Sequence, residues 1–432
     1  MRRRAMPLLA AAGLLCAASA FAASKGVAVT PDAANRRVDI TIDGKPFTSY
    51  IWPTTLKKPV LFPIVDADGV TVTRGWPLEP RAGERTDHPH HDGLWFNYSN
   101  VNGFDFWNNS TAIPEARAAK MGTIVLDKIV STKSGASRGE LVSNSTWIDG
   151  QNHAILAETT HFVFARHGAT RSIDVTVTLT ALDHVVFNDD KDGLLGLRVA
   201  RWLESPEEKG GTFTDANGNE TQVDSAPPDD TATYPTGEYL TSEGIKGEAV
   251  WSTRGRWCSL TGHEGDHGIR TATIAIFDHP GNVGYPTYWH ARGYGLFAVN
   301  PLGRHAFDAK QPPLNYTLEK GQSATFRYRI VFYTHAATAE ELGMVGAGLI
   351  LIVSFIILFR LTHFIEDAVS PAARAYLSGF FLIYLAQIFI HVGMNMGMLP
   401  VTGIPFPLLS AGGSSLLATM TGLGIALGAY KR

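Results

Sequence analysis

Three histidines lie close together in the stretch Asp87 to Trp107, whose sequence is DHPHHDGLWFNYSNVNGFDFW. In an extended chain alternate side chains share a face, so His88 and His90 project together while His91 projects with Pro89. Imidazole titrates near neutral pH and can exchange a proton with a hydroxyl or a ring oxygen. Few protein cores satisfy so many histidine nitrogens at once. The spacing therefore predicts that these three histidines are catalytic acid/base groups.

The same stretch mixes indole rings with short polar side chains. A carbohydrate presents apolar C–H faces that stack on aromatic rings and hydroxyls that pair with amides and carboxylates. The residues predicted to bind such a substrate are Trp95, Asn97, Asn102, Asp105 and Trp107. Phe96, Phe104 and Phe106 alternate along the same segment and are predicted to belong to the core instead.

A second cluster with the same composition lies downstream, in FDHPGNVGYPTYWHARGYGLFAVNPLG, residues 277–303. His290 is predicted to join the catalytic histidines, and Tyr288, Trp289 and Arg292 are predicted to contact the substrate. His279 precedes Pro-Gly and is predicted to belong to a turn. If the two clusters meet at the mouth of a β-sandwich, they form one site.

A metal site is the alternative use of these histidines. Zinc or iron needs a third ligand, which His290, Glu84 or Asp105 would have to supply. Neither of the two clusters contains a His-x-x-x-His or Cys-x-x-Cys pattern in support of such a site. The sequence therefore predicts neither a metal nor another cofactor, and a metal-dependent oxygenase is a minor alternative.

These clusters must be positioned by a β-rich region over residues 24–338. In HFVFARHGATRSIDVTVTLTAL, residues Ile173, Val175, Val177 and Leu179 alternate with Asp174 and threonines, and ATFRYRIVFYTH repeats this pattern near the end of the region. Asp43-Gly44 between two β-rich runs predicts a hairpin. The expected fold is a large antiparallel β-sandwich. Residues 205–240 are rich in Gly, Pro, Asn and Asp and are predicted to form a surface loop beside the site.

Both ends of the chain point to export and a membrane. Residues 1–22 have the charged start, the apolar run and the small-residue cleavage site of a secretory signal peptide. After residue 339 three apolar stretches, about 343–360, 375–394 and 408–430, are predicted to be transmembrane helices. Arg360, Arg374, Lys431 and Arg432 then face the cytoplasm, which places the β region in the periplasm of a bacterial inner-membrane protein.

The charge balance argues against a nucleic-acid-binding protein, and the cysteine content argues against a domain stabilised by disulfides. Lys and Arg number 37 against 40 Asp and Glu, a balance too even for the basic surface that nucleic-acid binding requires. Removal of the signal peptide would leave Cys258 as the single cysteine, so the exported region forms no intrachain disulfide and its stability must come from core burial.

The C-terminal sequence closely resembles the RodA/FtsW (SEDS) family of cell elongation and division. The resemblance rests on EELGMVGAGLILI at 340–352 and on LPVTGIPFPLLSAGGSSLL, with Ala411 where the family commonly has an aromatic residue. It implies a membrane protein that polymerises glycan from lipid-linked precursors, using an acidic residue before the Glu-Glu-Leu-Gly motif. Here residues 325–339 contain no carboxylate, so this segment is expected to anchor the chain without its own polymerase site.

Residues 24–338 resemble the PmoA-type family of secreted bacterial proteins. The matching blocks are DHPHHDGLWF, VNGFDFW, VWSTRGRW at 250–257 and DHPGNVGYPTYWHARGYGLFAVNPLG. The resemblance suggests a mutarotase-like supersandwich that works on sugars. The leading hypothesis is therefore a membrane-anchored periplasmic sandwich that binds or modifies a carbohydrate. The alternative is a cell-wall assembly or cell-shape component that recognises glycan and has elongation proteins as partners in the bilayer.

Overall fold

The computed structural model describes residues 25–168, 170–206, 209–215, 217–225, 235–264, 270–334, 338–395 and 413–430. The predicted signal peptide and most of the Leu399–Leu416 motif lie outside the described residues. Contacts divide the chain into two units, residues 1–335 and 336–432. Each unit is described by itself.

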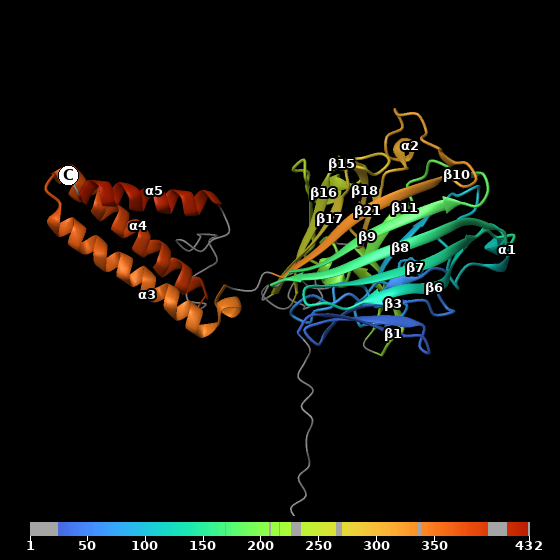
Figure 1. Ribbon diagram of the computed structural model, residues 1–432, viewed down its shortest axis with the longest axis horizontal. Helices are drawn as coiled ribbons and strands as arrows, with labels where there is room; N and C mark the ends of the chain where they lie inside the picture. The colour runs from blue at the N-terminus through green and yellow to red at the C-terminus, as the bar shows by residue number, and fades with distance from the viewer. Residues whose placement is uncertain are drawn as a thin grey trace, which may run out of the picture. The chain divides into compact units, whose positions relative to one another are not determined.

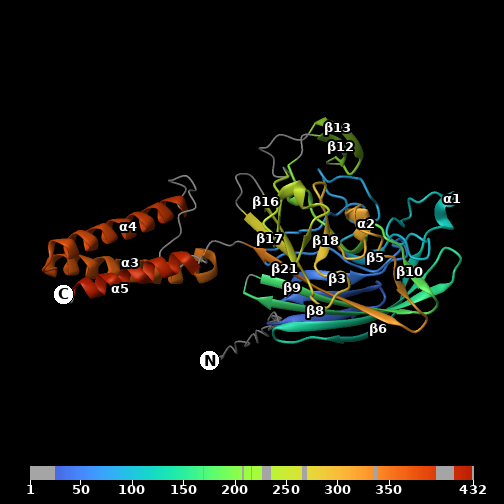
Figure 2. The same ribbon diagram turned by 90° about the horizontal axis from the view of Figure 1, so that it is seen from above.

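Two large sheets form the first unit (Figures 1 and 2). The nine-stranded sheet has the order β1 (Val27–Asp32), β2 (Arg37–Ile42), β3 (Lys45–Ile51), β4 (Val60–Leu61), β5 (Leu94–Tyr98), β11 (Gly193–Arg198), β19 (Leu296–Asn300), β18 (Thr287–Arg292) and β15 (Arg254–Gly255). The eight-stranded sheet has the order β14 (Glu238–Thr241), β16 (Trp257–Glu264), β17 (Arg270–Asp278), β21 (Ser323–Thr334), β9 (Thr170–Ala181), β8 (Ala154–His167), β7 (Arg138–Ile148) and β6 (Thr123–Lys133). Neighbouring strands in both sheets pair antiparallel, as predicted.

Shorter elements complete the described part of this unit. Two small two-stranded sheets pair β10 (Val185–Phe187) with β20 (Tyr316–Leu318) and β12 (Lys209–Thr214) with β13 (Glu220–Ser225). The remaining elements are α1 (Glu115–Ala118), α2 (Arg304–Phe307) and the 3₁₀ turns η1 (Arg201–Leu203) and η2 (Gly247–Val250). The β12–β13 pair falls inside the segment predicted to be a loop, so that prediction was wrong for its first half.

The core lies between the two sheets, and the alternation of apolar residues explains why. Ile173, Val177 and Leu179 of β9 are fully buried, whereas Asp174 and Thr176 on the opposite face are partly exposed. The same pattern holds along β21, and the core contains residues of both sheets. Phe96 and Phe106 also belong to this core, as predicted. The hairpin between β2 and β3 turns at Asp43-Gly44, where both residues have positive φ, as a two-residue type I′ turn requires.

The described residues of the second unit form three helices, α3 (Thr338–Asp367), α4 (Pro371–Asn395) and α5 (Gly413–Tyr430) (Figure 1). Leu361 of α3, Leu377 of α4 and Ala426 of α5 are buried against one another in a small cluster. Within the part of the chain that the structure describes, one stretch, Pro371–Ile390, is long and apolar enough to cross a membrane. Helices therefore occupy all three predicted spans, and the membrane crossing of α3 and α5 stays a prediction.

Candidate functional site

Four adjacent strands of the nine-stranded sheet, β5, β11, β19 and β18, bring the two sequence clusters onto one face. The strand pairing places Trp95 beside Gly196, Gly196 beside Ala298, and Ala298 beside His290. In the next row Arg198 lies beside Leu296, which lies beside Arg292. Because side chains alternate along a strand, these residues project away from the core between the sheets. Residues almost two hundred positions apart thus share one surface.

Three histidine rings pack together above this face. The ring centroids of His88 and His91 are 4.9 Å apart in a stacked arrangement, and those of His90 and His91 are 4.3 Å apart. His91 stacks in turn on Trp95 at 5.2 Å. The sequence prediction that these histidines gather therefore matches their positions in the structure, but their exposure to water differs widely.

His90 and His91 are buried, with 7% and 1% of their surface exposed. Burial, with a further contribution from the Lys58 ammonium, lowers the pKa of His90 to about 2. Burial also holds the pKa of His91 well below its ordinary value, with His90 the next cause. Both rings are therefore neutral at physiological pH. Neither Nε2 atom has a hydrogen-bond partner among the described residues.

His290 is equally enclosed, with 3% of its surface exposed. Its Nδ1 lies 3.1 Å from the carbonyl oxygen of Lys191 and 3.6 Å from Oδ1 of Asp192. Its ring packs edge-on against Phe307. Burial, followed by the charges of Lys191 and Arg292, lowers the pKa of His290 to about 3. The ring is held neutral and in a fixed orientation by its surroundings.

His88 differs from the other three because it reaches solvent. Its side chain is 40% exposed, and its Nδ1 lies 3.1 Å from Oδ2 of Asp87. Its backbone has φ of +47°, in the left-handed region that non-glycine residues rarely adopt. Such backbone strain is found preferentially at functional sites, where the surrounding structure enforces it.

Two buried arginines hold the Asp87 carboxylate in place. Its Oδ1 accepts a hydrogen bond of 2.7 Å from Arg74 and one of 2.6 Å from Arg198. Burial opposes ionisation of Asp87, but Arg198, His88 and Arg74 outweigh it and keep the pKa of this carboxyl well below its ordinary value. Asp87 is therefore ionised and positioned to accept the Nδ1–H of His88, which leaves Nε2 of that ring available for proton exchange.

Glu204 anchors the other end of this charged network. Arg85 donates a hydrogen bond of 3.0 Å to its carboxylate, Arg201 contacts the same oxygen, and Arg198 lies 3.9 Å from the other oxygen. Phe213 of β12 lies against the guanidinium groups of Arg85 and Arg201. Sequence analysis missed all of these residues, since isolated arginines on different elements form no local pattern. The one available signal was the position of residues 205–240, predicted to border the site.

A cavity of about 490 Å³ opens beside Asp87. Its walls are Arg85, Asp87, Glu248, Trp251, Ala291, Arg292, Gly293 and Tyr294. The Arg292 guanidinium lies 5.4 Å from the ring of Trp251 and 5.8 Å from that of Tyr294. Tyr294 also stacks on His88 at 4.9 Å. Asp87 and Tyr294 thus connect the exposed histidine to a cavity with aromatic walls, charged groups and room for a small ligand.

The remaining predicted substrate-binding residues lie elsewhere. Trp95, Asn97, Trp107, Tyr288 and Trp289 are all at most 5% exposed. Asn102 is exposed and bonds the backbone of His184 and Val186, while Asp105 accepts hydrogen bonds from the backbone of Trp107 and Asn108. Of the predicted set, Arg292 alone lines the cavity beside Asp87. Contact of the others with substrate stays a prediction.

Two of the candidate metal ligands accept hydrogen bonds from the backbone instead. Glu84 accepts from the N–H groups of Gly75 and Trp76, and Asp105 accepts from the N–H of Trp107. Among the described residues, no group of three or more His, Cys, Asp or Glu side chains is arranged to hold a metal ion. The oxygenase alternative therefore gains no support from the geometry of these residues.

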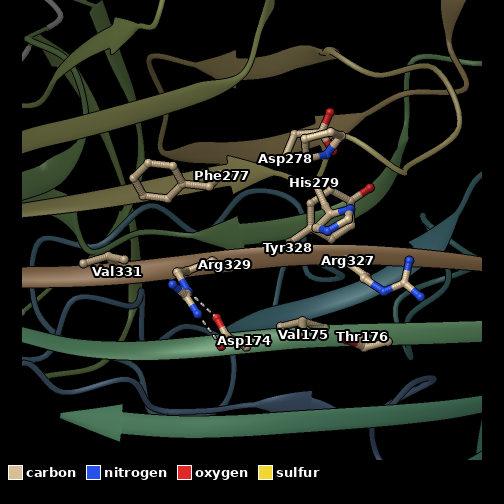
Figure 3. A pocket seen from close by; sticks show the side chains of 11 residues that line it. Asp174, Val175, Thr176, Phe277, Asp278, His279, Arg327, Tyr328, Arg329 and Val331 are labelled. Carbon is tan, nitrogen blue, oxygen red and sulfur yellow. Dashed lines mark hydrogen bonds and ion pairs between the residues drawn. The ribbon is translucent and has the colours of Figure 1, made fainter.

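A larger hollow of about 660 Å³ lies on the outer face of the eight-stranded sheet (Figure 3). Arg329 pairs there with Asp174 at 2.5 Å, so their charges are mutually satisfied. Burial raises the pKa of Asp278 to about 6 against the effect of its hydrogen bonds, the largest of which comes from Asn282. His279 accepts a hydrogen bond from the N–H of Gly281, as its predicted position in a turn requires. Among the described residues, no ion pair joins Asp278 to His279 in the way that Asp87 is joined to His88.

Two family models together match most of the chain. A model described as a family of unknown function (DUF6807) matches residues 37–345. The chain belongs to this family. The DUF6807 match spans the whole described site, whereas the PmoA-type resemblance stays a prediction. A second model, described as cell cycle protein of the FtsW, RodA and SpoVE type, matches residues 333–431 and confirms the predicted RodA/FtsW resemblance.

Curated relatives match the C-terminal segment. The peptidoglycan glycosyltransferase MrdB of Escherichia coli K12 is 37% identical over 95 residues, 22% of this chain and 26% of that protein. The probable peptidoglycan glycosyltransferase FtsW of Alcanivorax borkumensis is 42% identical over 104 residues, with the same coverage of each chain. The chain thus spans about a quarter of the length of these relatives.

Solved structures similar to this chain include two whose titles name sugar 1-epimerases, one of them as putative. The galactose 1-epimerase of Lactobacillus acidophilus is 10% identical with a TM-score of 0.33, over 72% of this chain and 100% of that one. A putative aldose 1-epimerase of Escherichia coli K12 is 10% identical with a TM-score of 0.29, over 72% and 99%. Similarity at this level does not identify an activity.

Proposed function

We propose that the DUF6807 region binds a carbohydrate in the cavity beside Asp87 and that His88 exchanges a proton with a hydroxyl or the ring oxygen of that sugar. The observation that supports this most directly is the Asp87–His88 pair, 3.1 Å apart, at the edge of a cavity of about 490 Å³. A carboxylate that fixes one ring nitrogen leaves the other ready to act as acid or base.

The walls of the cavity suit a sugar. The rings of Trp251 and Tyr294 offer the aromatic surface on which C–H faces stack, and Asp87 and Glu248 offer acceptors for hydroxyl groups. Trp251 is 36% exposed, which leaves part of its ring accessible to a ligand. The cavity volume is in the range of small-molecule sites.

The buried histidines have a supporting role in this proposal. His91 stacks under His88, and Tyr294 stacks on His88 as well, so the exposed ring is held at a fixed angle. The pKa values of His90, His91 and His290 are all lowered by burial, so these rings add no positive charge next to His88.

The C-terminal helices are proposed to anchor this region to the inner membrane, with the DUF6807 region in the periplasm. Large apolar side chains of α3 and α4, including Phe355, Phe359 and Phe389, are more than 60% exposed, as in helices that face lipid. The match to cell-cycle proteins over residues 333–431 favours a cell-wall glycan as the natural partner. It also supports the second candidate function, a glycan-recognising component of cell-wall assembly.

The test uses the full-length chain purified in detergent. Binding of glucose, galactose, N-acetylglucosamine and their uronic acids is measured by calorimetry, and exchange between anomers by NMR. We expect binding of at least one sugar, weakened about tenfold or more by Trp251→Ala because stacking on the indole is lost. His88→Asn is expected to reduce any exchange rate by roughly 10²- to 10⁴-fold, the usual contribution of a general acid or base, with little change in affinity.

The matched control is Phe277→Ala, which removes an exposed aromatic ring from the other hollow. It should leave binding unchanged. Absence of binding by every sugar, or equal loss in the Trp251 and Phe277 variants, would refute the carbohydrate proposal. Binding without anomer exchange would favour the glycan-recognition function over catalysis.

A further inference from the structure

Arg292 lies in the wall of the cavity, where its guanidinium can contact a bound ligand. Its half-buried side chain reaches the cavity from the end of β18, and its guanidinium lies near the rings of Trp251 and Tyr294. Among the described residues no hydrogen bond or ion pair joins its guanidinium to another side chain. Arginines 74, 85, 198 and 201 around the same cavity all make such bonds. The Arg292 guanidinium is thus held by aromatic rings with its N–H donors still available.

Among the described residues, arginines predominate over carboxylates around the cavity. The cavity walls and the groups ion-paired with them include five arginines among the described residues, at positions 74, 85, 198, 201 and 292. They include three carboxylates, Asp87, Glu204 and Glu248. Among these described residues the arginines outnumber the carboxylates by two. Guanidinium groups that line a partly enclosed site favour an anionic ligand.

We infer that the ligand is an acidic sugar whose carboxylate pairs with Arg292. This inference rests on the proposed carbohydrate function and specifies its substrate class. A guanidinium presents parallel N–H donors that match the two oxygens of a carboxylate. Contact with the rings of Trp251 and Tyr294 restricts the Arg292 side chain before the ligand arrives, so less side-chain entropy is lost on binding. Glu248 and Asp87 remain as acceptors for the hydroxyl groups of the same sugar ring.

The experiment compares matched pairs of sugars on the full-length chain in detergent. Galacturonate is compared with galactose, and glucuronate with glucose, by calorimetry at neutral pH. A charge-assisted hydrogen-bonded pair should make the acid bind roughly 10- to 100-fold more tightly than its neutral partner. Arg292→Gln should remove this preference, because it weakens binding of the acid far more than binding of the neutral sugar.

Two further variants define what Arg292 contributes. Arg292→Lys keeps the charge but loses the planar donors, and should retain only part of the preference for the acid. Arg329→Gln removes an exposed arginine from the other sheet and should leave the preference intact. A fold check by circular dichroism accompanies each variant.

The outcomes separate this inference from the proposed function. If galacturonate and galactose bind equally well to the unmodified chain, the acidic-sugar inference is wrong while carbohydrate binding stands. If the acid binds more tightly but Arg292→Gln keeps the preference, the assignment to Arg292 is wrong. If no sugar of either kind binds, both are refuted.

Discussion

The rim of the cavity, formed by Asp87 and His88, and the buried cluster of His90 and His91 both contain histidine, but in opposite environments. His88 is 40% exposed in its side chain and pairs with an ionised aspartate, whereas His90 and His91, two and three residues later, are 7% and 1% exposed. Burial removes the hydration that stabilises an imidazolium, so the inner rings are neutral. Proximity in sequence therefore does not make three histidines equivalent, and solvent access selects which of them can exchange protons with a ligand.

The charged network beneath the rim should show the largest effect on stability. Glu204 is 1% exposed in its side chain and is contacted by Arg85, Arg198 and Arg201. Glu204→Ala leaves these buried guanidinium groups without their shared carboxylate, and should lower the free energy of unfolding by roughly 3–5 kcal/mol. Urea unfolding followed by tryptophan fluorescence measures the change.

An exposed pair provides the control for this comparison. Arg37 and Asp39 lie 2.8 Å apart on β2 with 46% and 30% of their side chains exposed. Asp39→Asn should cost less than about 1 kcal/mol, because solvent screens exposed ion pairs. Similar losses in the two variants would mean that the network around Glu204 is not a buried unit.

The packing of the buried cluster gives the next prediction. A Cβ on Gly196 would lie 2.5 Å from Cζ2 of Trp95 and 3.0 Å from Cη2 of Trp107. Gly196→Ala should therefore displace Trp95, on which His91 stacks, and destabilise the protein by roughly 1–3 kcal/mol. Gly379→Ala in α4 is the control, since a Cβ there meets no atom within 4 Å. Unchanged stability and near-ultraviolet circular dichroism in the Gly196 variant would contradict this packing.

The sequence predicted the strands and the histidine cluster, but not which residues face water. Alternation in β9 reveals one buried and one partly exposed face, whereas every residue of β5, Leu94–Tyr98, is buried. Trp95 lies in a second apolar cluster with Val60 and Phe62, on the face of the sheet away from the main core. A strand pattern cannot indicate whether a distant segment covers that face, so Trp95 was predicted to bind substrate. Arg198 and Tyr294 were missed for the same reason, since long-range contacts alone bring them to the site.

The burial of His90 should make the free energy of unfolding depend on pH. The pKa of His90 is about 2 in the folded chain, well below the ordinary value of 6.5. Below pH 6.5 the unfolded state therefore binds a proton that the folded state does not, and this group makes the protein less stable as pH falls. The loss is roughly 2 kcal/mol at pH 5, at about 1.4 kcal/mol for each pH unit.

His90→Gln tests this sign directly. The variant cannot bind the proton in either state, so its stability should fall by roughly 2 kcal/mol less than that of the unmodified chain between pH 7.5 and pH 5. Taking the difference between the two proteins removes the effects of carboxyl groups such as Asp278, whose raised pKa of about 6 acts in the opposite direction. Parallel stability curves for the two proteins would show that His90 is protonated in the folded state.

The smallest effect on stability is expected at the rim, where the effect on any activity is largest. Asparagine tolerates positive φ better than most residues and can still donate to Asp87, so His88→Asn should change the free energy of unfolding by less than about 0.5 kcal/mol. His88→Ala adds strain in the left-handed region and should cost about 1 kcal/mol more. A loss of several kcal/mol in the Asn variant would make His88 a structural residue like its buried neighbours, and the distinction between rim and cluster would fail.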